Sequence, residues 1–138
     1  MSTFQVEVVS AEGQIFSGEA TAVYAAAITG EIGVLPRHAP LLTKLKPGAV
    51  RVQTATGEQN IFVGGGIMEV QPKLVTVLAD SALRAGDADE QAAIAAKKRA
   101  EEILAAGGKE IDLAKAQAEL VEAAARLKFV QDLNKTAR

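Results

Sequence analysis

The side chains best suited to chemistry stand in a stretch rich in proline and glycine, residues 30–48, which contains Glu31, Thr43 and the chain's single histidine, His38. A histidine acts in catalysis beside a nucleophile, and it holds a metal only together with further ligands. The stretch offers no nucleophile and base pair and no cluster of metal ligands. Its prolines and glycines fix the backbone rather than loosen it. We therefore predict a docking surface, with no catalytic residue and no metal site.

A second candidate for chemistry is the run Gly64-Gly65-Gly66, which has the composition of a phosphate-binding loop. Such a loop needs a following Gly-Lys-Ser/Thr, which this run does not have. The flanking segments, 61–63 and 67–70, are apolar and typical of strands. The run therefore predicts a bulge or a close approach of two backbones.

Composition excludes several classes of function. The 138 residues contain no cysteine, which rules out disulfides and thiolate metal sites. The net charge of −2 argues against a nucleic-acid binder, whose contact surface would be basic. The longest apolar run, 22–28, is too short to span a membrane, and the N-terminus lacks the basic and apolar regions of a signal peptide. We expect no nucleic-acid partner and no direct insertion into a membrane.

Residues 1–86 are expected to form the domain that carries the docking surface. Phe4, Val6 and Val8 alternate with polar residues, as do Val50 and Val52, which is the period of half-buried strands. Turn signals recur every eight to twelve residues or so, which favours an all-β fold over alternating strands and helices. Three hairpin turns are predicted, at 11–13, 56–58 and 71–73. The pattern predicts a β-sandwich or a flattened barrel and leaves the two undecided.

Residues 87–138 are expected to form a second domain, a C-terminal antiparallel hairpin of two helices. Asp87 and Glu90 form a capping pattern for a helix to about Ala106, and Gly107-Gly108 ends it. Asp112 is predicted to cap the second helix. The residues predicted to face each other are Ala93, Ala96, Ala100 and Ile103 in the first helix, and Leu113, Ala116, Leu120, Ala123, Leu127 and Val130 in the second.

The predicted seam between these helices consists largely of alanine, which buries little apolar area. Alanine, leucine, glutamate and lysine are nevertheless the strongest helix formers, so each helix can persist when the pair separates. A stable pair of helices with a weak seam is typical of an element that moves between two states.

The chain resembles the epsilon subunits of bacterial F-type ATP synthases, the subunits called delta in mitochondria. The resemblance rests on Gly-Glu-Ile-Gly-Val-Leu-Pro-Arg-His-Ala-Pro-Leu-Leu-Thr at 30–43, followed by Lys46-Pro47-Gly48. Further matching segments are 8–12, 16–18, 65–70 and 75–80. The resemblance implies a non-catalytic subunit of the central stalk, peripheral to the cytoplasmic face of the bacterial plasma membrane. It also implies a β domain docked on the gamma subunit and the membrane rotor ring, and a helical tail that extends into the catalytic head and inhibits ATP hydrolysis.

The same resemblance implies roles for individual residues. Ser10, His38 and Thr43 are expected to face the gamma subunit and the ring, and Glu31 the polar loops of the ring. Without the resemblance, Glu31 is a solvated charge at a turn. The basic residues of the tail are expected to meet an acidic loop of the beta subunit, although from the residues alone a solvated helix end is an equal alternative. These basic residues are Arg126, Lys128, Lys135 and Arg138.

Some members of the family bind ATP in the helical tail through the motif Ile/Leu-Asp-x-x-Arg-Ala and a later arginine. The matching segment here, 88–93, keeps Asp89 but has Ala92 in place of the motif arginine, while Arg99 stands at the later position. Arginine gives bidentate recognition of phosphate, and its loss removes the main donor. We expect weak or absent ATP binding and no cofactor.

Two other functions remain open from the residues. A small adaptor or binding module with an unrelated helical tail would be a stable monomer that never co-purifies with a membrane ATPase. A hydrolase using His38 would show turnover by the isolated chain, although no partner nucleophile stands near that residue in the sequence.

Overall fold

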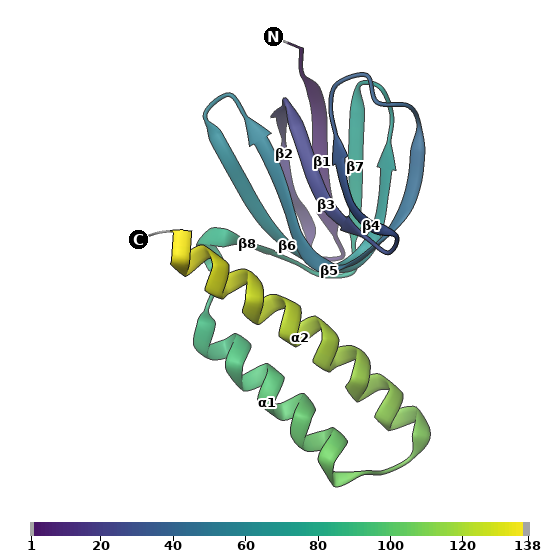
Figure 1. Ribbon diagram of the computed structural model, residues 1–138, viewed down its shortest axis with the longest axis vertical. Coiled ribbons are helices and arrows are strands. Elements are labelled where there is room, and N and C mark those ends of the chain that lie inside the picture. The colour runs from purple at the N-terminus through teal and green to yellow at the C-terminus, as the bar shows by residue number, and fades with distance from the viewer. Residues whose placement is uncertain (1, 137–138) are drawn as a thin grey trace. The chain divides into compact units, whose positions relative to one another are not determined.

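The computed structural model describes residues 2–136, with the backbone alone at 111 and 136. The chain divides into two compact units, Met1–Gly86 and Asp87–Arg138. The first unit is a β-sandwich and the second a two-helix hairpin, which confirms the predicted fold class (Figure 1). Neither helix combines the length and apolar composition that a membrane crossing requires, within the described residues.

The β unit contains eight strands in one sheet, ordered β2-β1-β7-β6-β5-β3-β4, with β8 paired to β6. The strands are β1 (Phe4–Ser10), β2 (Gly13–Ala20), β3 (Ala22–Ala27), β4 (Gly30–Val34), β5 (Leu41–Thr54), β6 (Gly57–Val70), β7 (Leu74–Ala79) and β8 (Ala82–Arg84), followed by a 3₁₀ turn at Ala85–Asp87. In this order β2 and β4 are the two ends, so the sheet is not closed in the described residues. The fold is therefore the sandwich and not the barrel.

The sandwich arises because β5 and β6 each continue through both layers. They are fourteen residues long and antiparallel, and their pairing is interrupted only opposite Lys46 and Gly65. On one side of this interruption β6 pairs with β7, and on the other with β8. The long hairpin thus folds over on itself (Figure 1).

The core lies between the two layers and follows the predicted alternation. Phe4, Val6 and Val8 of β1 are buried, as are Val50 and Val52 of β5. All three predicted hairpin turns are present, joining β1 to β2, β5 to β6 and β6 to β7. Four pairings were not predicted: the β3–β4 hairpin, the parallel pair of β1 with β7, and the antiparallel pairs of β3 with β5 and of β6 with β8.

The glycine run at 64–66 is a close approach of backbones, as predicted. Gly66 has φ +141°, and a Cβ there would lie 2.9 Å from the Cα of Ala79 and would collide with the carbonyl oxygen of Leu78. Only glycine lets β7 pass at this distance. The run is therefore structural.

The helical unit consists of α1 (Glu90–Ala106) and α2 (Glu110–Thr136). Asp89, not the predicted Asp87, caps α1, because its carboxylate accepts from the backbone N–H groups of Gln91 and Ala92. The 3₁₀ turn that ends at Asp87 shifts the helix start by two residues. The prediction that Asp112 caps α2 is also wrong, since α2 already begins at Glu110.

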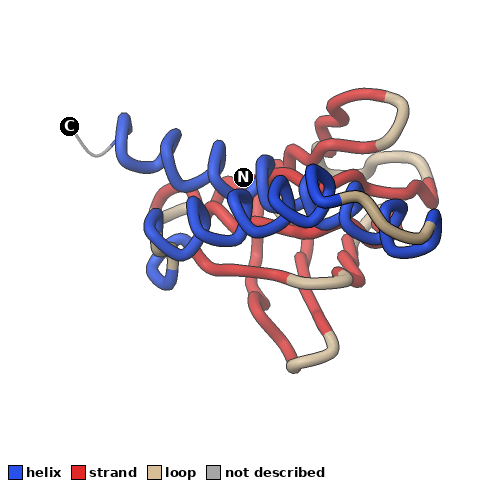
Figure 2. Tube along the Cα trace, turned by 90° about the horizontal axis from the view of Figure 1, so that it is seen from below, coloured by secondary structure: helices blue, strands red, loops and turns tan. Residues whose placement is uncertain are grey.

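Gly107 ends α1 with φ +74°, as predicted. Figure 2 shows the two helices, in blue, side by side. Within the described residues, four of their six buried residues are predicted alanines, Ala93, Ala100, Ala116 and Ala123; the others are Val130, which was predicted, and Phe129, which was not. Ile103, which was expected in the seam, is exposed instead.

Candidate docking surface

The β unit exposes an apolar strip, formed by Leu42 on β5, Ile67 on β6 and Leu78 on β7. Their side chains are 68%, 40% and 54% exposed. Ile67 stands directly opposite Leu78, and Leu42 is diagonal to Ile67 because their cross-strand partners are Glu69 and Lys44. Neighbouring side chains on one face of a sheet contact each other, so the three form one surface. Contiguous exposed apolar surface marks an interaction site.

A shallow groove borders the Leu42 end of the strip. It is lined by Pro40, Leu41, Leu42, Glu69, Val70 and Gln71 and has a volume of about 310 Å³. The amide of Gln71 donates to the carboxylate of Glu69 at 2.6 Å, which holds the polar rim in place. The apolar strip is thus continuous with a recess that a partner side chain can fill.

The loop 35–40, which carries His38, is fixed by its backbone. Arg37 has φ +65°, its N–H donates to the carbonyl of Pro72, and the N–H of His38 donates to the carbonyl of Leu35. The His38 ring donates from Nδ1 to the carbonyl of Ala39 at 2.7 Å. The half-buried ring therefore takes part in shaping the loop.

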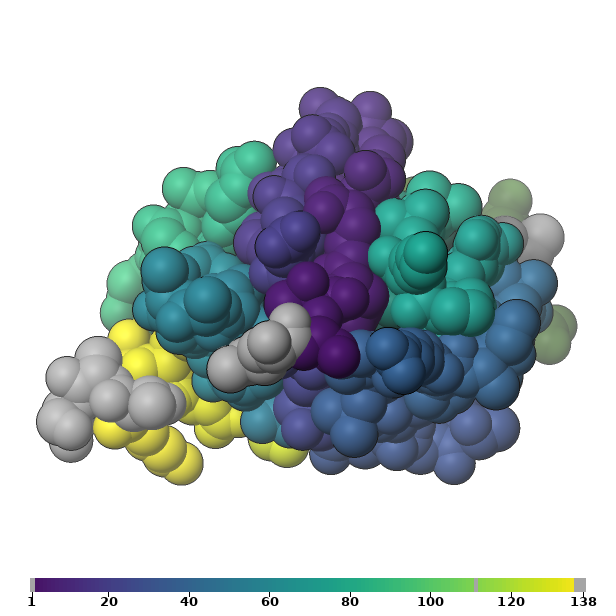
Figure 3. Space-filling view, turned by 90° about the horizontal axis from the view of Figure 1, so that it is seen from above, coloured from purple at the N-terminus to yellow at the C-terminus, as the bar shows by residue number. Residues whose placement is uncertain are grey.

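Figure 3 shows this end of the sandwich, where the start of β1, in purple, lies beside the turn 71–73 and the loop 35–40. A hollow of about 370 Å³ lies here, lined by Ser2, Thr3, Phe4, Gln5, Glu19, Pro36, Arg37, Pro72 and Lys73. The loop that carries His38 is therefore packed against the beginning of the chain.

Ser10 lies at the opposite end of β1 from the His38 loop. Its hydroxyl accepts from the N–H of Glu12 and so shapes the β1–β2 turn. A seven-residue strand spans roughly 20 Å, so Ser10 and His38 do not share one contact point. Thr43 lies between these ends on β5 and is half-buried, while its neighbour Leu42 is exposed. The structure spreads the predicted contact residues along the length of the strands.

Glu31 lies on the edge strand β4 and is held by Arg51. One guanidinium nitrogen of Arg51 is 2.9 Å from the Glu31 carboxylate, and the other is 3.8 Å from Glu58. The same guanidinium lies 4.9 Å from the centre of the Tyr24 ring. Glu31 is thus an oriented charge and not a free one.

The candidate nucleotide residues Asp89 and Arg99 are not brought together. Asp89 uses its carboxylate as the cap of α1, and Arg99 stands ten positions further on, about 15 Å along the axis. The described residues contain no group of three or more side chains placed to hold a metal ion.

The basic residues of α2 lie on different faces of the helix. Lys128 and Lys135 are seven positions apart and share one side of the helix, whereas Arg126 stands two positions from Lys128 and points elsewhere. Arg126 lies 3.8 Å from Glu122, one turn earlier. Arg138 lies outside the described residues.

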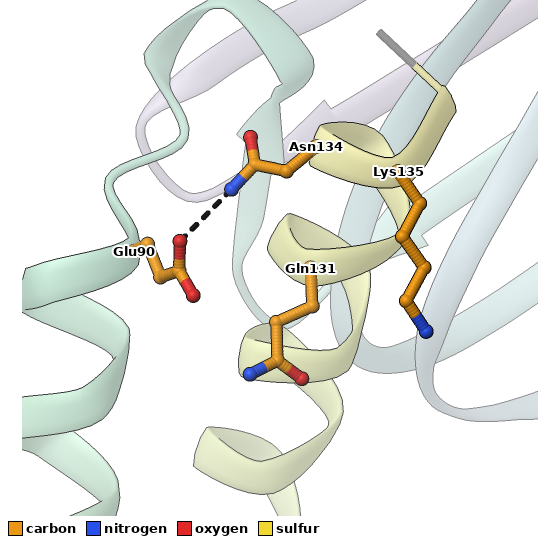
Figure 4. Close-up of a pocket in the computed structure, with 4 residues that line it drawn as sticks. All are labelled: Glu90, Gln131, Asn134 and Lys135. Carbon is orange, nitrogen blue, oxygen red and sulfur yellow. Dashed lines mark hydrogen bonds between the residues drawn. The ribbon is translucent and has the colours of Figure 1, made fainter. Parts of the chain in front are cut away.

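A polar pocket of about 400 Å³ lies between the start of α1 and the last turns of α2, lined by Glu90, Gln131, Asn134 and Lys135. Figure 4 shows its one hydrogen bond among these four residues, from the amide of Asn134 to the carboxylate of Glu90 at 2.9 Å. This bond joins the open ends of the hairpin.

The two units match two models of one family. Residues 3–85 match the family described as "ATP synthase, Delta/Epsilon chain, beta-sandwich domain", and residues 87–131 match "ATP synthase, Delta/Epsilon chain, long alpha-helix domain". The chain belongs to the ATP synthase delta/epsilon family. The resemblance to the central-stalk epsilon chain is thereby confirmed, and an adaptor unrelated to ATP synthase is the wrong interpretation. Members of this family are subunits of the complex that couples proton transport to ATP synthesis.

Several bacterial relatives named ATP synthase epsilon chain align over nearly the whole length. The chain is 54% identical to that of Nitrosococcus oceani over 96% of both chains. It is 52% identical to that of Xylella fastidiosa, over 100% of this chain and 99% of the relative. The family assignment therefore covers both units.

Solved structures share the fold at low sequence identity. A chain of the Euglena gracilis mitochondrial ATP synthase, from a structure of OSCP/F1/c-ring, superposes with a TM-score of 0.79 at 17% identity, over 100% of this chain and 83% of that one. A chain from the Tetrahymena thermophila central stalk/c-ring structure superposes with a TM-score of 0.57 at 11% identity, over 99% and 98%. These likenesses support the fold.

The sequence did not single out Ile67 and Leu78 as contact residues, and it included Leu42 only as part of the predicted docking stretch 30–48. Each belongs to an apolar segment in which inward and outward positions are both apolar, such as Leu41-Leu42. An outward-facing position of a sheet with one solvated face is normally polar. An apolar residue at such a position was therefore the sequence signal that could have indicated the strip.

Proposed function

We propose that this chain is a non-catalytic rotor subunit of the proton-translocating F-type ATP synthase, whose β unit docks on the gamma subunit and the membrane rotor ring. The observation that carries the proposal is the apolar strip of Leu42, Ile67 and Leu78 on a chain of this family. In this proposal the chain lies at the cytoplasmic face of the bacterial plasma membrane, as a peripheral part of the complex.

The course of the strip supports this role. Leu42 stands just after the loop that carries His38, and Leu78 pairs with Val9, next to Ser10. The strip therefore runs from one predicted gamma contact to the other, with Thr43 beside its first residue. One elongated partner lying along the strands, such as the gamma subunit, would cover the strip from end to end, whereas the side chain of Thr43 points to the other face of β5.

In the proposal, the helical unit regulates the catalytic head. Both buried residues of α1 are alanines, so separating α1 from α2 exposes little apolar area on that helix. The extended tail would inhibit ATP hydrolysis by blocking the head, with Lys128 and Lys135 on the face toward an acidic loop of the beta subunit. Arg126 and Arg138 complete the proposed basic contact. We propose no cofactor, and weak or absent ATP binding at Asp89 and Arg99.

The docking role is tested by Ile67→Lys, which places a charge in the centre of the strip. Loss of a central apolar contact costs about 2 kcal/mol or more at a hot spot, so we expect affinity for the purified gamma subunit to fall more than tenfold. The matched control is Val121→Lys on α2, where an exposed apolar residue receives the same charge. Titration of gamma with each labelled variant measures the change, and wild-type affinity of Ile67→Lys would refute docking through the strip.

A further inference from the structure

A cluster of four side chains lies across neighbouring strands of the β unit, away from the apolar strip. Tyr24 on β3 stands opposite Gly33 on β4 and opposite Arg51 on β5. Glu31 precedes Gly33 by two positions on β4 and therefore shares its face. Glu58 on β6 completes the cluster through Arg51.

Gly33 makes room for the ring of Tyr24, the chain's single tyrosine. A Cβ built at Gly33 would lie 3.0 and 3.1 Å from two ring carbons of Tyr24, which is closer than an ordinary van der Waals contact. One edge of the ring, with Cδ1 and Cε1, therefore lies against Gly33 of the edge strand. A larger residue at position 33 would push it away.

The Tyr24 ring in turn supports Arg51, whose guanidinium carbon is 4.9 Å from the ring centre. A guanidinium over an aromatic face is attracted by the negative face of the ring. On the other side, Arg51 is 3.8 Å from Glu58, which also accepts from the amide of Gln53 at 2.8 Å. Besides Glu31, Arg51 thus contacts residues of two other strands, Tyr24 on β3 and Glu58 on β6.

Glu31 is the outermost member of the cluster. Its side chain is 63% exposed, while that of Arg51 is 42% exposed, and the two are joined by a hydrogen bond of 2.9 Å. An exposed glutamate has several rotamers of similar energy, and a fixed guanidinium selects among them. Arg51 therefore determines where the Glu31 carboxylate points.

We propose that Arg51 is the positioning residue that holds Glu31 in the orientation in which it meets the rotor ring. The proposal rests on the proposed function, in which Glu31 is the ring contact. Arg51 acts through Glu31, so its contribution to binding disappears when the Glu31 carboxylate is absent. Preorganising a contact residue in this way lowers the conformational entropy that is lost on binding.

A purely structural role makes a different prediction. Charged residues on an edge strand prevent other chains from pairing with it. The ion pair of Glu31 with Arg51 would protect the edge strand β4 in this way even if Glu31 contacted no partner subunit. In that case Arg51 would act on the stability of the edge and not through Glu31. The two roles are separated by a double-mutant cycle.

The cycle uses the full chain and the purified ATP synthase complex from which this chain has been removed, with Arg51→Ala, Glu31→Gln and the double variant. Because surface ion pairs contribute little, we expect Arg51→Ala to weaken binding only about two- to fivefold. We expect no further loss when the same change is made in Glu31→Gln. Arg51→Lys, which keeps the charge and loses the planar stacking, is expected to retain part of the affinity. Glu101→Gln is the control, since it removes an exposed carboxylate in the middle of α1, outside the cluster, and is expected to leave binding near the wild-type value.

Equal losses from Arg51→Ala in both backgrounds would overturn the positioning role and leave the Glu31 contact standing. Unchanged binding by Glu31→Gln would instead overturn the Glu31 contact itself, and the positioning role with it. Far-UV circular dichroism of each variant establishes that the sandwich is intact, and Arg51→Lys serves as the probe if Arg51→Ala does not fold.

Discussion

Gly66 shows how one residue limits the way the sandwich can be built. Its φ of +141° and the passing β7 backbone leave no space for a side chain. Because β6 folds from one layer to the other near this residue, a shift here affects the pairing of both layers. The glycine run that looks like a phosphate loop is therefore explained by backbone packing.

We expect Gly66→Ala to destabilise the β unit by about 2–4 kcal/mol, since the new methyl group meets the backbone of Leu78 and Ala79. The matched control is Gly57→Ala, where φ is +137° and nothing lies within 4 Å of the added Cβ. Urea unfolding followed by the fluorescence of Tyr24 measures both. Equal losses in the two variants would show that backbone strain alone, and not the collision, sets the cost.

Ala92 stands where the nucleotide-binding motif of some family members has an arginine. Without the motif arginine, the remaining Arg99 lies far along α1 from Asp89, whose carboxylate is engaged by the helix backbone. Calorimetric titration of the full chain with ATP is expected to show a dissociation constant in the millimolar range or weaker. Binding well below millimolar would contradict this expectation.

At the scale of elements, the helical hairpin combines good helix signals with a weak interface. Asp89 satisfies two backbone N–H groups at the start of α1, and Gly107 ends the helix by donating to the carbonyl of Leu104. Between these ends the buried residues of α1 are alanines. Local signals therefore contribute a large share of the stability of this helix.

We expect Asp89→Ala to lower the stability of the helical unit by about 1 kcal/mol, because two amide groups lose their acceptor. Thermal unfolding followed by circular dichroism at 222 nm measures the change. Glu101→Ala, at an exposed position in the middle of α1, is the control and is expected to have little effect. A loss no larger than that of the control would argue against Asp89 as the cap.

The sequence predicted those elements that are specified by neighbouring residues. Alternation in 4–8 and 50–52 and glycine at the turns and at 107–108 predicted strands, hairpins and the end of α1 correctly. The parallel pairing of β1 with β7 joins residues about seventy positions apart, and no local pattern encodes it. The helix cap was misplaced because Asp87 and Asp89 are both good caps, and the 3₁₀ turn decides between them.

The same limit applies to the candidate site. His38, Glu31 and Thr43 were singled out because they stand in one conspicuous stretch, and their contacts with partner subunits stay a prediction. The apolar strip and the Tyr24–Arg51 stack combine residues from separate strands, so they become visible only when the register is known. Sequence reasoning finds contiguous motifs more easily than surfaces.

At the scale of the whole molecule, the β unit has its own core. The buried cluster draws its members from Phe4 to Ala79, all within the first unit. A domain with a complete core can fold alone. Removal of the helices is therefore a usable test of their role.

We expect a chain that ends at Gly86 to assemble into the complex, because the apolar strip and Glu31 are retained. ATP hydrolysis by that complex is expected to rise above that of the complex with the full chain, since the proposed block is gone. Steady-state hydrolysis by the two purified complexes measures the difference, and amide NMR spectra of the shortened chain establish its folding. Equal hydrolysis rates would remove inhibition from the proposed function.

The continuity of β5 and β6 through both layers has a mechanical consequence. Sliding one layer past the other would require stretching two covalent backbones and breaking a ladder of hydrogen bonds that runs from Leu41 to Thr54. Such a body resists shear better than two sheets joined only by side-chain packing. For a part proposed to turn with a shaft, torque applied at one face is passed to the other with little elastic loss.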